Sequence, residues 1–178
     1  MRVIAGTHRG RRLEAPDTSD TRPVMDRVKE SLFSSIVAEV PGAAVLDLFA
    51  GAGSFGIEAM SRGADSVVFV ESARKALAAL EANLATLRME ADVVAGPVER
   101  FVEADRRRFD LVFCDPPWPM ASQTVADLLS QLAPRLDSDT TVIVTRRTGD
   151  PVPEPVGLRI DDVRAHGDTT IIRYVMDE

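Results

Sequence analysis

Cysteine is almost absent from this 178-residue sequence, which contains only Cys114. A single cysteine excludes intramolecular disulfides and argues against a cysteine-based metal site, so we expect no metal. No apolar run reaches the roughly 18 residues that cross a bilayer. No hydrophobic segment of signal type follows the first arginines. These absences predict a soluble, unprocessed, cytoplasmic protein that does not enter a membrane.

Positive charge is also scarce, because 21 lysines and arginines face 28 acidic residues and leave a net charge of -7. Such a balance argues against indiscriminate nucleic-acid binding. The segment that precedes the first acid, Glu14, nevertheless carries the arginines Arg2, Arg9, Arg11 and Arg12. We interpret this segment as a basic arm on an acidic body, and a solvated tail is the alternative.

The chain length and an apolar content of 45% fit one compact domain, with a monomer as the default expectation. Short, nearly continuous apolar runs are typical of parallel strands that are covered on both faces. These runs are Ala44–Leu48, residues 66–70, Asp92–Ala95, residues 109–114 and residues 141–145. Helical spacing precedes and separates them, at residues 28–40, 55–62, 73–88, 98–106 and 122–136.

Alternating residues predict a β-hairpin at each end of the chain. Residues 2–6 and 11–15 form the first, and residues 158–165 with Thr169–Met176 form the second, across a turn at 166–168. The predicted fold is therefore α/β and Rossmann-like. It consists of a doubly wound, mostly parallel, seven-stranded sheet that ends in the C-terminal hairpin, with a small N-terminal hairpin and helix as an extension.

A glycine-rich loop follows the first predicted strand and contains Gly51, Gly53 and Gly56. Glu71 ends the next strand, twenty residues after Gly51. Glycines permit a tight turn and close approach of the backbone, and the acid can accept hydrogen bonds from a ribose. This pattern predicts an adenosine-containing cofactor but does not separate NAD from S-adenosylmethionine (SAM).

Asp47 favours SAM over NAD. It lies four residues before the first glycine, where a carboxylate would repel a pyrophosphate and attract the ammonium group of a methionine moiety. The plainer alternatives are a capping aspartate at this position and, for Glu71, an exposed carboxylate that begins a helix. The loop after the third strand, with Pro97 and Val98, would lie beside the adenine through backbone groups.

The motif Asp115-Pro116-Pro117-Trp118 follows the fourth predicted strand, at the edge where open α/β sheets bind ligands. The prolines rigidify the segment, so the Asp115 carboxylate and the Pro116 carbonyl can hold the hydrogens of an exocyclic base amine. Trp118 can then stack on the base. Methyl transfer would depend on positioning for in-line displacement, without a metal or a covalent intermediate. The plainer alternative is a capping aspartate with prolines that close a strand.

With these motifs in place, essentially the whole sequence resembles the bacterial RsmD-type 16S rRNA guanine-N2 methyltransferases, which are class I SAM-dependent enzymes. The most specific similarity lies in the N-terminal part of the chain. It consists of Arg2-Val-Ile-Ala-Gly6, Gly10-Arg-Arg-Leu13, Thr21-Arg-Pro23, Asp26-Arg-Val-Lys-Glu30 and Leu32-Phe33. This sequence departs from the family in having Trp118 where tyrosine or phenylalanine is usual, and in its overall acidity.

The resemblance implies that Asp47, Gly51, Gly53 and Glu71 serve SAM and that residues 115–118 hold the target base. It implies methylation of N2 of guanine 966 in 16S rRNA, within the small ribosomal subunit or an assembly intermediate. Residues 1–22 would then be an RNA-contacting arm and residues 23–178 the methyltransferase domain. The arginines expected near phosphates are Arg2, Arg9, Arg11, Arg12, Arg22 and the pair Arg146-Arg147.

Three alternatives remain open at the level of sequence. The first is another amine methyltransferase, acting on adenine N6 in DNA or on a protein glutamine. An NAD-dependent oxidoreductase would leave Asp47 and the Asp-Pro-Pro-Trp motif unexplained, and a non-catalytic RNA-binding module would not require Asp115. Separately, Asp26, Arg27, Lys29 and Glu30 either pair along a helix surface or cover the cofactor.

Overall fold

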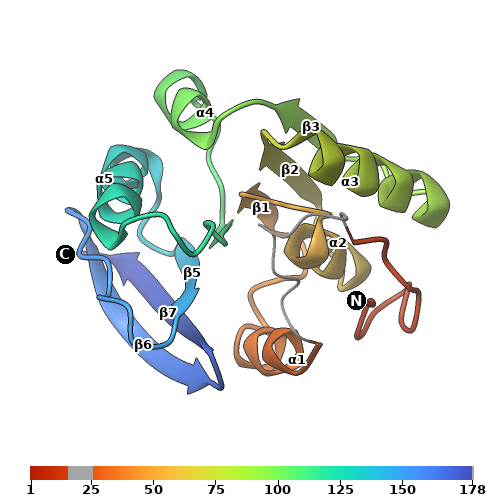
Figure 1. The fold of residues 1–178 in the computed structure, drawn as a ribbon, viewed down its shortest axis with the longest axis horizontal. Coiled ribbons are helices and arrows are strands. Elements are labelled where there is room, and N and C mark those ends of the chain that lie inside the picture. Colours follow the sequence, from red (N-terminus) through yellow and green to blue (C-terminus); the bar gives the residue numbers. More distant parts are fainter. Residues whose placement is uncertain (16–25, 178) are drawn as a thin grey trace.

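A seven-stranded sheet forms the centre of the protein in the computed structural model, which describes residues 1–15 and 26–177 (Figure 1). The strand order is β3-β2-β1-β4-β5-β7-β6, with β7 antiparallel to β5 and to β6 and all other neighbours parallel. The strands are β1 (Ala44–Leu48), β2 (Ser66–Glu71), β3 (Asp92–Ala95), β4 (Leu111–Cys114), β5 (Thr141–Arg147), β6 (Leu158–His166) and β7 (Thr169–Met176).

Helices cover both faces of this sheet. They are α1 (Asp26–Ser35), α2 (Ser54–Ser61), α3 (Arg74–Leu87), α4 (Val98–Ala104), α5 (Ser122–Leu132) and the short 3-10 helix η1 (Ala133–Arg135). Successive strand residues point to opposite faces, so Val45 joins one core cluster with α1, α2 and α3, and Leu46 joins the other with α4 and α5. Both clusters are buried, which explains the continuous apolar runs and confirms the predicted doubly wound α/β fold.

Two predicted helices end earlier than their apolar spacing suggested. The first ends at Ser35, and the chain continues in turns although Ile36 and Val40 remain buried. Their spacing therefore reflects burial in the core rather than helical periodicity. The predicted helix at 122–136 ends at Leu132 and continues as η1, which contains Pro134, a residue without a backbone donor.

The predicted N-terminal hairpin is reduced to one antiparallel bridge, between Arg2 and Arg12. It does not widen into strands because the next backbone donors turn away from the partner segment. The N–H groups of Ile4 and Ala5 donate to the Glu58 carboxylate of α2 at 2.7 and 3.0 Å. The arm is therefore anchored to α2, and its Val3 side chain is buried in the core.

Within residues 1–15 and 26–177, no helix combines the length and apolar character that a membrane span requires.

Candidate active site

The residues predicted for the site converge on one edge of the sheet, where β1, β2 and β4 end. Leu48 pairs with Val70 on one side and with Cys114 on the other. The segments that follow these three residues therefore begin side by side: the glycine loop, Glu71, and Asp115 with its prolines. This is the edge at which open α/β sheets bind ligands.

Asp47 supplies a buried carboxylate beneath the glycine loop. Its side chain is 1% exposed, and Oδ2 accepts a hydrogen bond from the Gly56 N–H of α2 at 2.8 Å. Oδ1 is equally buried and has no hydrogen-bond partner among the described residues. Burial, with smaller contributions from Asp115 and Glu71, raises the pKa of Asp47 well above its usual range, against the Gly56 bond. The group is thus arranged to gain from a cationic ligand at Oδ1.

Glu71 holds the glycine loop to the end of β2. One carboxylate oxygen accepts from the Gly51 N–H at 2.8 Å, and the other accepts from the backbone of Ser72 and Ala73. Gly51 has a left-handed backbone with a φ of 58°, and a Cβ added there would meet open space. Ligand atoms can therefore approach the main chain closely on that side.

The loop after β3 lies beside the end of β2, because the Gly96 N–H donates to the backbone carbonyl of Glu71 at 2.9 Å. Pro97 is exposed and precedes the first turn of α4. Val98 points into the core and is 3% exposed. The structure therefore places the start of this loop beside Glu71 and turns the Val98 side chain away into the core.

Asp115 begins the predicted base-binding motif and is partly buried. Its backbone N–H donates to the Leu48 carbonyl at 3.2 Å, and the Thr145 hydroxyl donates to its Oδ1. Burial raises the pKa of Asp115 to about 6, although the Thr145 bond acts in the opposite direction. Near neutral pH the carboxylate is mostly ionised and can accept hydrogen bonds.

The remainder of the motif forms a turn that is hydrogen-bonded to the buried Arg146 side chain. Pro116 is buried, Pro117 is exposed, and the Pro117 carbonyl accepts from the Met120 N–H at 2.9 Å. Arg146, predicted to contact phosphates, has a side chain that is only 3% exposed and donates to the Met120 carbonyl at 2.7 Å. Its position indicates support of the turn.

Arg147 is the exposed member of that arginine pair. Its guanidinium carbon lies 5.8 Å from the centroid of the Trp118 ring, within the range of a cation–π contact. Sequence reasoning named Arg147 only as the neighbour of Arg146. The alternation of side chains along a strand could have separated the two, because consecutive residues point to opposite faces.

The predicted basic arm presents four exposed arginines, Arg2, Arg9, Arg11 and Arg12. Arg2 also forms an ion pair of 2.9 Å with Asp26 of α1. Arg22 lies outside the described residues. The structure thus leaves the arginine side chains of the arm at the surface.

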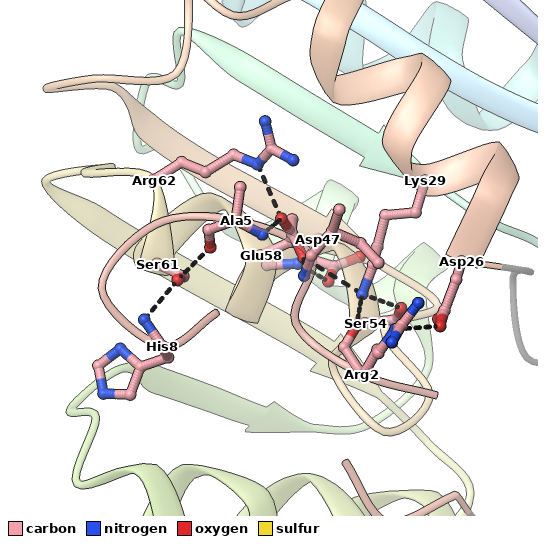
Figure 2. A network of polar contacts seen from close by, with 12 residues as sticks. Arg2, Ala5, His8, Asp26, Lys29, Asp47, Ser54, Glu58, Ser61 and Arg62 are labelled. Carbon is pink, nitrogen blue, oxygen red and sulfur yellow. Dashed lines mark hydrogen bonds and ion pairs between the residues drawn. The ribbon is translucent and has the colours of Figure 1, made fainter. Parts of the chain in front are cut away.

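A buried polar network docks the arm onto α1 and α2 (Figure 2). Lys29 donates to the Arg2 carbonyl at 2.5 Å and to the Ser54 hydroxyl at 3.4 Å, and forms an ion pair with Glu58. Ser61 accepts from the His8 N–H and donates to the Ala5 carbonyl. Because Ser54 opens α2 directly after the glycine loop, one short helix contacts both the arm and the candidate cofactor loop.

Two of the α1 charges, those of Asp26 and Lys29, pair with other segments and not along the surface of their own helix. Lys29 is completely buried and pairs with Glu58 of α2 rather than along its own helix. Asp26 pairs with Arg2 of the arm. These charges join the arm to the domain.

Comparison with known proteins places these features in a family. The model of the family described as Conserved hypothetical protein 95 matches residues 1–175. YlbH of Bacillus subtilis (strain 168) is 37% identical over 162 residues, which make up 88% of each chain. Ribosomal RNA small subunit methyltransferase D of Escherichia coli (strain K12) is 40% identical over 119 residues, covering 66% of this chain and 60% of that enzyme.

A solved structure agrees with this sequence similarity. The Escherichia coli protein YhhF matches with a TM-score of 0.85 at 30% identity, covering 99% of this chain and 98% of that chain. The match extends over the described arm as well as the sheet, and it confirms the predicted class I methyltransferase fold. The chain belongs to the Conserved hypothetical protein 95 family, the RsmD-type methyltransferase family that its sequence resembles.

Proposed function

We propose that this chain is a SAM-dependent rRNA methyltransferase that modifies the exocyclic N2 of a guanine in 16S rRNA, the guanine at position 966. One observation carries the proposal: Asp47 and Asp115 meet at one sheet edge. The first has a buried, unpaired oxygen suited to an ammonium group, and the second has one oxygen held and the other available for an amine.

The residues at the glycine loop fit SAM. The unpaired Asp47 oxygen suits its ammonium group, and the open side of Gly51 allows the backbone to approach the ligand. Gly53 serves the loop differently, because its φ is 85° and a Cβ there would lie 2.5 Å from the Leu80 side chain. Glu71, already fixed by the loop N–H groups, has lone pairs left for ribose hydroxyls. The loop at Pro97 and Val98 is proposed to border the adenine. When bound, SAM supplies an electrophilic methyl group on sulfur.

The chain's own contribution is to orient the amine and to accept its proton. Asp115 and the Pro116 carbonyl accept hydrogen bonds from the two N–H groups of the target amine, and Trp118 stacks on the base. The nitrogen lone pair then points towards the methyl group. SAM would supply the methyl group to this nitrogen, and the two acceptors with Trp118 would hold the amine in line for that transfer. The methylated nitrogen is strongly acidic and releases its proton to Asp115 or to water.

We propose that the RNA lies across the arm and the Trp118 turn. Arg2, Arg9, Arg11 and Arg12 are exposed and would contact phosphates of the small ribosomal subunit or its assembly intermediate. Residues 1–22 would act as the arm of a monomeric enzyme whose methyltransferase domain spans 23–178. A concentrated basic arm accounts for RNA binding by a chain with a net charge of -7.

Transfer of a labelled methyl group tests this function. Small ribosomal subunits that lack the modification are incubated with labelled SAM and the protein, and their RNA is digested to nucleosides. We expect labelled N2-methylguanosine, and no label with Asp115→Asn, which keeps the shape of the side chain but not its charge. Label in DNA or protein alone would overturn the rRNA assignment and favour the other amine methyltransferases.

Ligand binding tests the cofactor separately. S-adenosylhomocysteine (SAH) is expected to raise the melting temperature, because it binds the folded state only, and NADH is not. Asp47→Asn should weaken SAH binding by roughly tenfold or more, as expected for loss of a hydrogen bond to a charged group. Stabilisation by NADH with none by SAH would contradict the cofactor proposal.

A further inference from the structure

Thr145 is an unusual residue for its position in β5. The strand runs through the core, where Val142, Ile143 and Val144 are buried, and Thr145 itself is 2% exposed. A hydroxyl at such a position costs free energy unless it is hydrogen-bonded, so a valine would be the simpler choice. The hydroxyl donates to Asp115 Oδ1. The partner of this buried polar group is therefore the first residue of the proposed base-binding motif.

The sheet register fixes this contact. Cys114 of β4 pairs with Val144 of β5, so Asp115 and Thr145 are the next residues along two neighbouring strands. On its other side Thr145 pairs with Ile171 of β7. A β-branched side chain between two strands has a restricted χ1 angle, so the hydroxyl has a defined direction.

A held carboxylate differs chemically from a mobile one. The terminal torsion of an aspartate is broad, so an unrestrained carboxylate samples many orientations. With Oδ1 bound to Thr145, the plane of the carboxylate is set and Oδ2 is directed to one place. An acceptor in a fixed place orients an amine at no further entropic cost during the reaction.

The same hydrogen bond favours the ionised form of Asp115, because a donor stabilises the charged carboxylate. The surroundings otherwise oppose ionisation. Burial of Asp115 is the cause, and the other titratable groups nearby are Asp47 of β1 and the buried thiol of Cys114. Among the described residues no ion pair to Asp115 is formed from α1, α2, β5 or β7. Thr145 is the neighbour that favours the ionised state.

We propose that Thr145 is a positioning residue for methyl transfer, which fixes the Asp115 carboxylate through Oδ1 so that Oδ2 accepts the N–H of the target amine. The assignment rests on the proposed function of Asp115. It adds the Thr145 side chain of β5 to a site whose other proposed residues lie at or after the ends of β1, β2, β3 and β4.

Two substitutions at this position separate positioning from packing. Thr145→Val keeps the shape and removes the hydroxyl, whereas Thr145→Ser keeps the hydroxyl and removes a methyl group. We expect Thr145→Val to lower kcat by roughly ten- to a hundredfold, the effect of losing a hydrogen bond to a charged group. The acid limb of its pH–rate profile should move to higher pH. Thr145→Ser should keep the wild-type limb and most of kcat.

Binding of SAH to both variants shows that each is folded, and the affinity should be unchanged. Equal losses in Thr145→Val and Thr145→Ser, with no movement of the acid limb, would reduce Thr145 to a packing residue and overturn the proposal. A wild-type kcat in Thr145→Val would do the same.

Carbon-detected NMR titration of the Asp115 carboxyl group gives a readout that needs no turnover. Its pKa should rise in Thr145→Val and stay near the wild-type value in Thr145→Ser. If the wild-type protein transfers no methyl group to rRNA, the proposed function fails while this titration still tests the contact. If rRNA is methylated but Asp115 titrates identically in all three proteins, the positioning role alone is wrong.

Discussion

Lys29 and Glu58 form an ion pair of 3.3 Å in which both side chains are completely buried (Figure 2). Burial lowers the pKa of Lys29 although Glu58 opposes the shift. Glu58 also accepts two N–H bonds from the arm and one from Arg62. These additional hydrogen bonds to the Glu58 carboxylate allow the two charges to remain buried away from water. The pair holds α1, α2 and the arm together.

Removing one partner should leave the other charge buried and unpaired. We expect Lys29→Met to lower the free energy of unfolding by about 3–5 kcal/mol, measured by urea denaturation. The matched control is Arg164→Ala, which removes an ion pair with Asp162 whose side chains are 54% and 41% exposed. The control should change stability by less than about 1 kcal/mol. Equal losses of unfolding free energy for the two substitutions would show that the buried pair stabilises the fold no more than an exposed pair does.

Gly6 is required by the close approach of the arm to α2. Its φ is 83°, and a Cβ added there would lie 1.7 Å from the Ser61 carbonyl oxygen. Gly10 has almost the same backbone, with a φ of 82°, but a Cβ there would meet nothing within 4 Å. Gly10→Ala should therefore cost only the left-handed strain of about 1–2 kcal/mol. Gly6→Ala should cost more and should expose the arm to proteolysis, and a ranking in the opposite order would contradict this docking.

Stability should depend on pH through the site carboxyls. Asp115 has a pKa of about 6 in the folded protein, and that of Asp47 is also raised, so the folded state keeps protons that the unfolded state has released. The free energy of unfolding should therefore fall as pH rises from about 4 to 6, by at most roughly 3 kcal/mol for Asp115.

The comparison of wild type with Asp115→Asn isolates that contribution. The asparagine variant has no charge to gain, so its stability should decline less between those pH values, as measured by denaturation at each pH. A parallel pair of curves would mean that Asp115 is solvated like an ordinary surface carboxylate.

Arg147 should contribute to RNA binding through charge. Replacing it by alanine is expected to weaken RNA binding severalfold at low salt and to reduce the slope of log affinity against log salt by about one. The control is Arg159→Ala. Arg159 is exposed and lies near the start of β6, at the opposite end of the strands from Arg147. Because Trp118 is the single tryptophan, its fluorescence should report RNA binding directly. An unchanged salt slope in Arg147→Ala would remove this residue from the interface.

The sheet could be predicted, and so could the gathering of the proposed site residues at one of its edges, because the signals for both are local. Continuous apolar runs mark strands that are covered on both faces, and the spacing of Asp47, the glycines and Glu71 follows from one β-strand, turn and helix. The Asp115 motif is contiguous in sequence. Each of these patterns constrains neighbouring residues along the chain, so the sequence alone was sufficient.

The missing pieces depend on contacts between distant segments. Thr145 meets Asp115 only through the register of β4 and β5, which a sequence does not display. Lys29 looks like one charge in an ordinary helix until α2 lies beside it. The prediction of two N-terminal strands was wrong for the same reason. The Glu58 carboxylate accepts the backbone hydrogen bonds that a longer hairpin would use.

The docking of the arm through its main chain separates two tasks that often constrain each other in evolution. The N–H groups of Ile4, Ala5, Thr7 and His8 make the bonds to α2, and these bonds use no side-chain atoms of the arm. Outward-facing positions such as Arg9 and Arg11 can therefore diverge between species, or be redesigned for a different RNA, while the arm stays bound to α2 next to the glycine loop.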